Sequence, residues 1–283
     1  MSATVFDNRV CTLGEGPFWH PTRKQLFWFD IVNHRLLSRL GNRALDWRFD
    51  EPVSAAGWID HDTLLIASAS ALLRFDIDTG DREDIVALEA RNRVTRSNDG
   101  RADPHGGFWI GTMGHAFEPG AGSIYRYYRG QLEKLYDGVT VSNSICFAPD
   151  GRTAYWTDTT TRRILRQDLD GQGWPDGAPD VFVDLTEQGY NPDGAVVDSE
   201  GAVWSAHWNA GMVARYLPDG RFDRMAEVGG RLASCPEFGG TDLSVLYVTT
   251  ATMGMRNPKP GDGQTYEARV GVTGLPQYRV EFS

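Results

Sequence analysis

Short runs of apolar and aromatic residues recur along the chain at nearly regular intervals. Their central residues are 38 to 49 positions apart, and no stretch shows the periodicity of a long helix. The six runs occupy residues 26–30, 64–68, 108–112, 154–158, 203–207 and 246–250. A turn-forming segment precedes most of them, such as APDGR at 148–152. Each run therefore predicts a β-hairpin with the strand before its turn.

Two further strand-like runs follow the hairpin in most units. In the first unit they lie at 34–40 and 44–50, and in the second at 71–77 and 82–88. Four strands repeated at this spacing are typical of a propeller blade. Six units fill the chain, so the sequence predicts an all-β protein: a six-bladed β-propeller with four antiparallel strands per blade, in one domain over residues 1–283.

The last unit has the weakest pattern. Its outer strands are expected at 268–272 and 277–282, which read ARVGV and QYRVEF. The N-terminal segment ATVFD at 3–7 is also strand-like. Whether this segment joins the last blade and closes the ring is left open at this stage.

Composition and charge narrow the function classes. The formal charge of −10 argues against nucleic acid and anionic membranes as partners, because both bind basic surfaces. No apolar run is long enough to span a membrane, and the N-terminus lacks the features of a signal peptide. Three cysteines, Cys11, Cys146 and Cys235, do not form a disulfide framework or a zinc motif. A cytoplasmic protein is expected.

The first strand of each propeller blade lines the central channel, so the six units can be aligned on their first turns. Glu15 then lies six residues before Pro21, and Asn98 lies six before Pro104. The same register places one residue from every blade at the axis: Glu15, Ser54, Asn98, Asn143, Asp193, and Cys235 or its neighbour Ser234. Carboxylates and carboxamides that converge in this way are costly to bury without a cation, and their oxygen atoms suit a divalent ion.

Four segments carry a resemblance to a known family. They are LGEGPFWHP at 13–21, RSNDGRADPHGGFWIGTM at 96–113, SNSICFAPDGRTAYWTD at 142–158 and NPDGAVVDSEGAVW at 191–204, with a weaker match at 234–251. In this order they resemble the gluconolactonase/regucalcin (senescence marker protein) family of six-bladed propellers, and especially bacterial members that open aldonolactones.

The resemblance implies residue roles. It implies Glu15, Asn143 and Asp193 as metal ligands, with Arg96 and Asn98 on the substrate side of the ion. Some family members also carry an acidic residue on the loop after the GTM motif that touches substrate hydroxyls. Glu118 is the candidate for that role here, with His115 as the other possibility. A role for Asp99 in the site is left open. His207 is interpreted as a packed or solvated side chain, and Trp208 either stacks on sugar or belongs to the core.

The expected activity is metal-dependent hydrolysis of a sugar lactone, with Asp193 accepting the proton of the attacking water. These ligands are compatible with calcium, manganese, zinc, magnesium and iron(II). The sequence does not identify the sugar of the lactone or its ring size. No GxSxG or HExxH motif occurs, which argues against two other hydrolase mechanisms. The alternatives are a non-catalytic calcium-binding propeller and an esterase of other lactones or organophosphates on the same scaffold.

Overall fold

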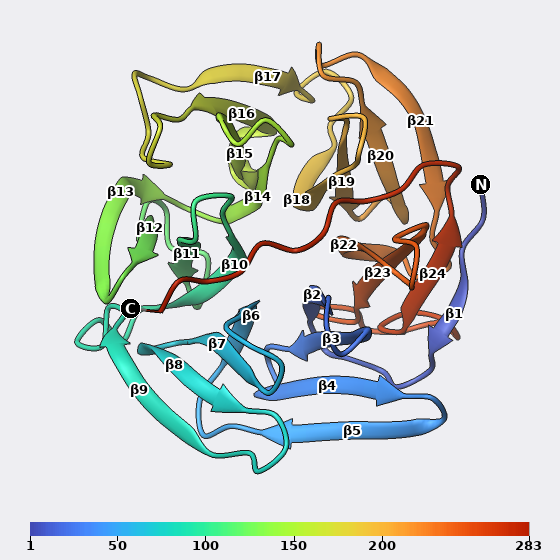
Figure 1. The fold of residues 1–283 in the computed structure, drawn as a ribbon. Helices are drawn as coiled ribbons and strands as arrows, with labels where there is room; N and C mark the ends of the chain where they lie inside the picture. Colours follow the sequence, from blue (N-terminus) through green and yellow to red (C-terminus); the bar gives the residue numbers. More distant parts are fainter. Residues whose placement is uncertain (283) are drawn as a thin grey trace.

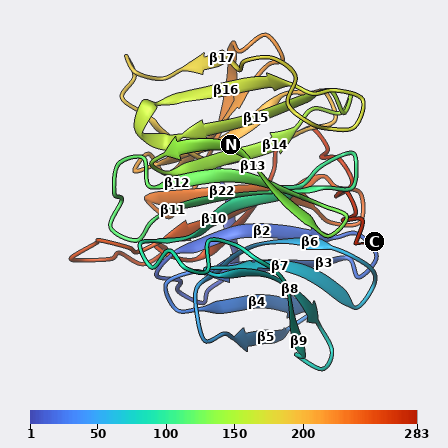
Figure 2. The same cartoon turned by 90° about the vertical axis from the view of Figure 1, so that its left-hand side faces the viewer.

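The computed structural model describes residues 1–282 and shows six four-stranded antiparallel sheets around a central axis (Figure 1, Figure 2). The first three blades, from the innermost strand outward, are β2 (Gly14–His20), β3 (Gln25–Asp30), β4 (Arg35–Leu40) and β5 (Arg43–Arg48); β6 (Val53–Trp58), β7 (Thr63–Ser68), β8 (Ala71–Asp76) and β9 (Arg82–Ala87); and β10 (Thr95–Ala102), β11 (Phe108–Gly114), β12 (Gly122–Tyr128) and β13 (Gln131–Val139).

The other three are β14 (Ser142–Phe147), β15 (Thr153–Asp158), β16 (Arg163–Asp168) and β17 (Asp180–Asp184); β18 (Asn191–Val197), β19 (Val203–Trp208), β20 (Met212–Tyr216) and β21 (Phe222–Glu227); and β22 (Leu232–Gly239), β23 (Val245–Ala251), β24 (Thr265–Arg269) and β1 (Thr4–Asp7). Among the described residues the one helix is the 3₁₀ turn η1 (Thr159–Thr161), and none is long and apolar enough to cross a membrane. The predicted six-bladed architecture is confirmed.

Burial falls from the axis to the rim of each blade. Every residue of β2 and β3 is buried, whereas β5 at the rim alternates between exposed and half-buried positions. Strands buried on both faces read as continuous apolar runs, while a half-exposed strand reads as an alternation. For this reason the second strand of every blade was the clearest signal in the sequence.

The N-terminus closes the ring. β1 pairs antiparallel with β24, so the last blade takes its outermost strand from the beginning of the chain. The prediction of an outer strand at 277–282 is therefore wrong, and the strand expected at 268–272 lies instead at Thr265–Arg269. A pairing between segments from opposite ends of the chain leaves no trace in local patterning.

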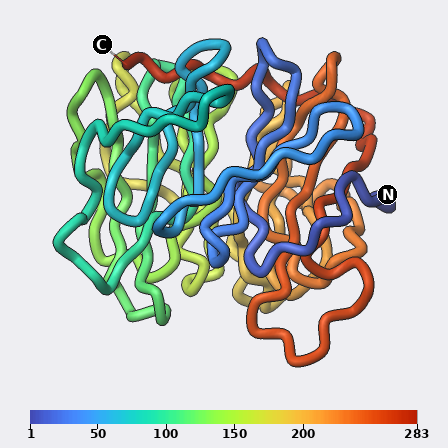
Figure 3. The backbone as a smooth tube through the Cα atoms, turned by 90° about the horizontal axis from the view of Figure 1, so that it is seen from below, coloured from blue at the N-terminus to red at the C-terminus, as the bar shows by residue number. Residues whose placement is uncertain are grey.

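The displaced C-terminal segment crosses one face of the propeller, where Figure 1 shows it passing over the axis. Its backbone bonds to four blades: Val280 N–H to Trp58 O, Glu281 N–H to Gly106 O, Gly274 N–H to Leu243 O, and Ser199 N–H to Thr273 O. This segment, residues 270–282, is called the strap below. It covers the end of the channel at which the innermost strands finish. Figure 3 shows the long loop between β23 and β24 projecting from the opposite face.

A buried ion pair fills the channel above the strap. Arg101 Nη1 lies 2.6 Å from Glu237 Oε2, and the same guanidinium donates to the carbonyl oxygens of Ile145 and Ala195. The strap contributes Gln277, whose side-chain amide donates to the other oxygen of Glu237 at 2.7 Å. One arginine thus joins four blades at this end of the channel.

Val280 is the apolar anchor of the strap. Its side chain is fully buried, and a Cβ added at Gly57 would lie only 2.6 Å from its Cγ2. Val280→Asp would bury an unpaired carboxylate there, and we expect it to lower the free energy of unfolding by about 3 kcal/mol. Urea denaturation measures this. Glu281→Gln, which changes an exposed ion pair on the neighbouring residue, is the control and should have little effect. A wild-type unfolding midpoint for Val280→Asp would show that the strap does not stabilise the ring.

Candidate active site

Every innermost strand is irregular near the middle of the channel. The pairing register shifts once in each, between Glu15 and Phe18, Val53 and Ala55, Ser97 and Gly100, Asn143 and Cys146, Pro192 and Ala195, and Ala233 and Cys235. These are β-bulges, which bend a strand and redirect its side chains. Two bulge residues have left-handed backbones: Gly16 with φ 50° and Ser144 with φ 57°. The bulges aim the residues beside them at the axis.

A cavity of about 210 Å³ lies at the end of the channel where the innermost strands begin. Its polar lining includes four of the residues that the axial register singled out, Glu15, Asn98, Asn143 and Asp193, together with Arg96, which the family resemblance named. All five side chains are buried. The structure therefore brings these residues together, while their individual roles remain predictions.

The two carboxamides are held by a chain of hydrogen bonds. Asn98 Nδ2 donates to Ser142 O at 2.8 Å and to Asn143 Oδ1 at 3.1 Å, and its Oδ1 accepts from Arg96. Asn143 Nδ2 donates to Thr159 Oγ1 at 3.0 Å, and that hydroxyl donates to Pro192 O. Asn143 thus directs its amide nitrogen at Thr159 and its oxygen at the amide nitrogen of Asn98.

The carboxylates of Glu15 and Asp193 are poorly solvated. Burial, followed by the charge of Asp99, raises the pKa of Glu15 to about 8. Burial, followed by the charge of Glu15, raises the pKa of Asp193 well above its usual value. Arg96 stays cationic at neutral pH although desolvation lowers its pKa to about 10. Two carboxylates and an amide oxygen around one small cavity form a donor set that fits a hard divalent cation.

The other residues of the axial register carry no acidic or amide side chain, and their hydroxyl groups bond to neighbouring innermost strands. Ser54 Oγ donates to Ser97 Oγ at 2.8 Å, Ser234 Oγ donates to Gly14 O, and Cys235 is a buried free thiol. Asp99 lies beside the cavity but outside its lining, and it accepts the Ile145 N–H at 2.7 Å. Its carboxylate supports the backbone of the fourth blade and adds negative charge to the site.

Glu118 lies outside the cavity lining, apart from the five site residues named above. Its Oε2 accepts the backbone N–H of Ala116 at 3.0 Å, within the loop that follows β11. The residue of this loop that reaches the cavity is Phe117, which is 49% exposed and has a φ of 61°. A substrate contact by Glu118 stays a prediction. His115 is exposed and also lies outside the lining.

An apolar collar surrounds the polar residues at the cavity mouth. Its members come from several different blades or their loops: Leu13, Met113, Phe117, Val141, Trp208 and Met253. The sequence analysis allowed either a sugar-stacking or a core role for Trp208 and did not single out the other five. Single apolar residues near strand ends cannot be distinguished from core residues in a sequence. His207, next to Trp208, is buried and stacked on Tyr216, so of the two alternatives, a packed or a solvated side chain, the structure shows the packed one.

Fold and site together define a class: six-bladed propellers with carboxylates and carboxamides converging on the axis. Residues 13–252 match the SMP-30/gluconolactonase/LRE-like family, and the chain belongs to that family. The sequence resemblance is thereby confirmed.

Relatives and solved structures cover nearly the whole chain. A pentonolactonase from Haloferax volcanii is 34% identical, covering 99% of this chain and 99% of the relative. An L-arabinolactonase from Azospirillum brasilense is 34% identical, covering 92% of this chain and 88% of the relative. The crystal structure of a calcium-binding protein, regucalcin, from Agrobacterium tumefaciens superimposes with a TM-score of 0.97 at 37% identity, covering 100% of this chain and 99% of that one.

The raised pKa of Glu15 has a consequence for stability. Between its usual value of 4.5 and about 8, the folded state binds more protons than the unfolded state. The free energy of unfolding of chelator-treated protein should therefore fall as pH rises through this window. Glu15→Gln removes this carboxyl group. We therefore expect the free energy of unfolding of the variant to fall less over this pH range than that of the wild type, by at least about 1 kcal/mol.

Urea unfolding at pH 5, 6, 7 and 8 measures this dependence. Glu83→Gln, on the exposed rim strand β9, is the matched control and should leave the pH profile unchanged. Parallel profiles for wild type and Glu15→Gln would mean that folding does not raise the pKa of Glu15.

Proposed function

We propose that this protein is a metal-dependent sugar lactonase that hydrolyses an aldonolactone to the sugar acid. The observation that carries the proposal is the cavity itself, which is lined by two buried carboxylates, two buried carboxamides and a buried arginine. The names of the pentonolactonase and the L-arabinolactonase support the substrate class.

Glu15, Asn143 and Asp193 would hold the divalent ion. The fit is supported by the raised pKa of both carboxyl groups, since a cation stabilises their charged forms where solvent does not. A bound divalent ion supplies Lewis acidity toward the lactone carbonyl and lowers the pKa of water. Calcium, manganese, zinc, magnesium and iron(II) are all compatible with these ligands.

Asp193 is the proposed base. Its carboxylate takes a proton from the attacking water as the water oxygen bonds to the carbonyl carbon. The ring C–O bond then breaks, and the same proton passes to the departing ring oxygen, which becomes a hydroxyl of the open sugar acid.

Arg96 and Asn98 are proposed to orient the sugar. Among the described residues, Arg96 is hydrogen-bonded only through Nη1, to Ser97 O and Asn98 Oδ1. The rest of its guanidinium is available to donate to ring and hydroxyl oxygens. Asn98 holds Arg96 and Asn143 in place, so one amide links the substrate side of the cavity to the cation side.

A calcium-binding propeller without catalysis is the second candidate, favoured by the similarity to the Agrobacterium regucalcin structure, which is described as that of a calcium-binding protein. A structural ion does not need a buried arginine turned toward the cavity. Arg96 therefore favours the enzyme.

Proton release from glucono-1,5-lactone tests the proposal, measured above spontaneous hydrolysis with chelated protein and after adding back each of the five metals. We expect at least one metal to restore the rate. Asp193→Asn should lower kcat by about 10²- to 10⁴-fold, because it removes the base. Cation binding without acceleration on a panel of sugar lactones would favour the calcium-binding propeller. Retained turnover in Asp193→Asn would remove Asp193 from its role as base.

Arg96→Ala separates substrate binding from cation binding. Loss of charge-assisted hydrogen bonds should lower kcat/KM for glucono-1,5-lactone by about 10- to 100-fold, mainly through KM. The dissociation constant of the cation, measured by calorimetry, should stay near the wild-type value. A weakened cation site would instead place Arg96 in a structural role, and Arg96→Lys shows whether charge alone is sufficient.

A further inference from the structure

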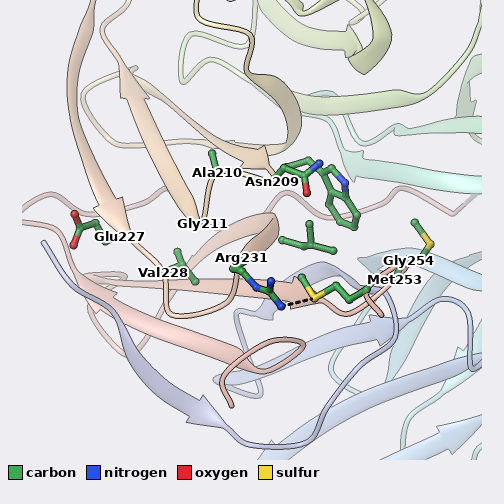
Figure 4. Close-up of a pocket in the computed structure, with 11 residues that line it drawn as sticks. Asn209, Ala210, Gly211, Glu227, Val228, Arg231, Met253 and Gly254 are labelled. Carbon is green, nitrogen blue, oxygen red and sulfur yellow. Dashed lines mark hydrogen bonds between the residues drawn. The ribbon is translucent and has the colours of Figure 1, made fainter. Parts of the chain in front are cut away.

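A second, larger cavity adjoins the axial one on the same face of the propeller. Its volume is about 750 Å³, and three connections between strands line it. They are the turn from β19 to β20, the turn from β21 to β22, and the start of the long loop after β23. Figure 4 shows Asn209, Arg231 and Met253 around this space, with Glu227 at the far end from Met253.

The two cavities share a wall. Trp208 and Met253 line both of them, and both pack against a buried cluster that includes Leu13 and Leu232. Trp208 is half-buried and stands at the end of β19, directly after the packed His207. A ligand that fills the axial cavity and extends past this wall enters the outer cavity.

The lining of the outer cavity combines charged, polar and aromatic side chains and carries no net positive charge. Arg231 Nη2 lies 2.6 Å from Asp262 Oδ2, so its charge is compensated, and Glu227 is a further acid on the lining. An anionic extension therefore finds no net positive charge. Asn209 is exposed and presents both a donor and an acceptor, while Trp208 provides an aromatic surface. Donors and acceptors without net charge, beside an aromatic face, match a neutral group rich in hydroxyls.

We propose that the outer cavity is a second sugar subsite, which takes a glycosyl group attached to the lactone ring in the axial cavity. The preferred substrate is then a glycosylated aldonolactone, the lactone of an oxidised disaccharide. This inference rests on the proposed lactonase function. The volumes agree with the assignment, because the axial cavity of about 210 Å³ suits one small ring, and the outer cavity is more than three times larger.

The test compares glucono-1,5-lactone with cellobiono-1,5-lactone, with the metal-loaded protein and after subtracting spontaneous hydrolysis. We expect the disaccharide lactone to have a KM about tenfold lower, which corresponds to about 1.4 kcal/mol of added binding. Ala210→Trp places a large side chain in the outer cavity from a position that does not line the axial one. The KM ratio of the two lactones should fall to about one or reverse.

Two further variants keep the test decisive. Asn209→Ala removes a polar group without adding bulk. It should raise the KM of the disaccharide lactone and leave the KM of glucono-1,5-lactone unchanged. Ala87→Trp, on the exposed end of rim strand β9, is the matched control for Ala210→Trp and should leave the KM ratio unchanged.

The outcomes separate the two proposals. Hydrolysis of the glucono-lactone with no KM advantage for the disaccharide lactone overturns the second subsite and leaves the lactonase proposal intact. The second subsite is also overturned if the advantage exists but neither Ala210→Trp nor Asn209→Ala changes it. If no sugar lactone is hydrolysed with any of the five metals, the lactonase proposal fails and the subsite proposal falls with it.

Discussion

Two carboxylates buried on one axis are the constraint around which this structure is organised. Glu15 and Asp193 come from different blades, and the charge of Glu15 raises the pKa of Asp193 in addition to the effect of burial. Such a pair is unfavourable in a core of apolar sheets unless another group compensates the charge. Arg96 provides part of that compensation, and the oxygen-rich cavity between the blades suits a cation for the rest.

The surrounding architecture serves to keep this polar centre in place. A bulge in each innermost strand turns axial residues inward, and the chain from Arg96 through Asn98 and Asn143 to Thr159 fixes their orientation. At the other end of the channel, Arg101 pairs with Glu237 and the strap covers both. The cavity therefore lies at the end of the channel opposite the strap, where loops of several blades determine what can enter.

Those loops give the two cavities different characters. The axial cavity has a charged interior and an apolar collar, whereas the outer cavity combines a compensated arginine, an amide and an aromatic wall. None of the collar residues except Trp208 could be singled out from the sequence. Leu13, Phe117 and Met253 belong to three different connections, and only the closure of the ring brings them to one opening.

The sequence by itself determined the blades and the axial register, because strand alternation and turn spacing are local properties that survive in the linear order. It placed Glu15, Asn98, Asn143 and Asp193 at one height in the channel, and the cavity contains all four. The tertiary structure alone decided that β1 completes the last blade, that residues 277–282 become a strap rather than a strand, and that Phe117, not Glu118, reaches the cavity. These outcomes depend on pairing and packing between segments distant in the chain, and such contacts have no periodicity from which they could be read.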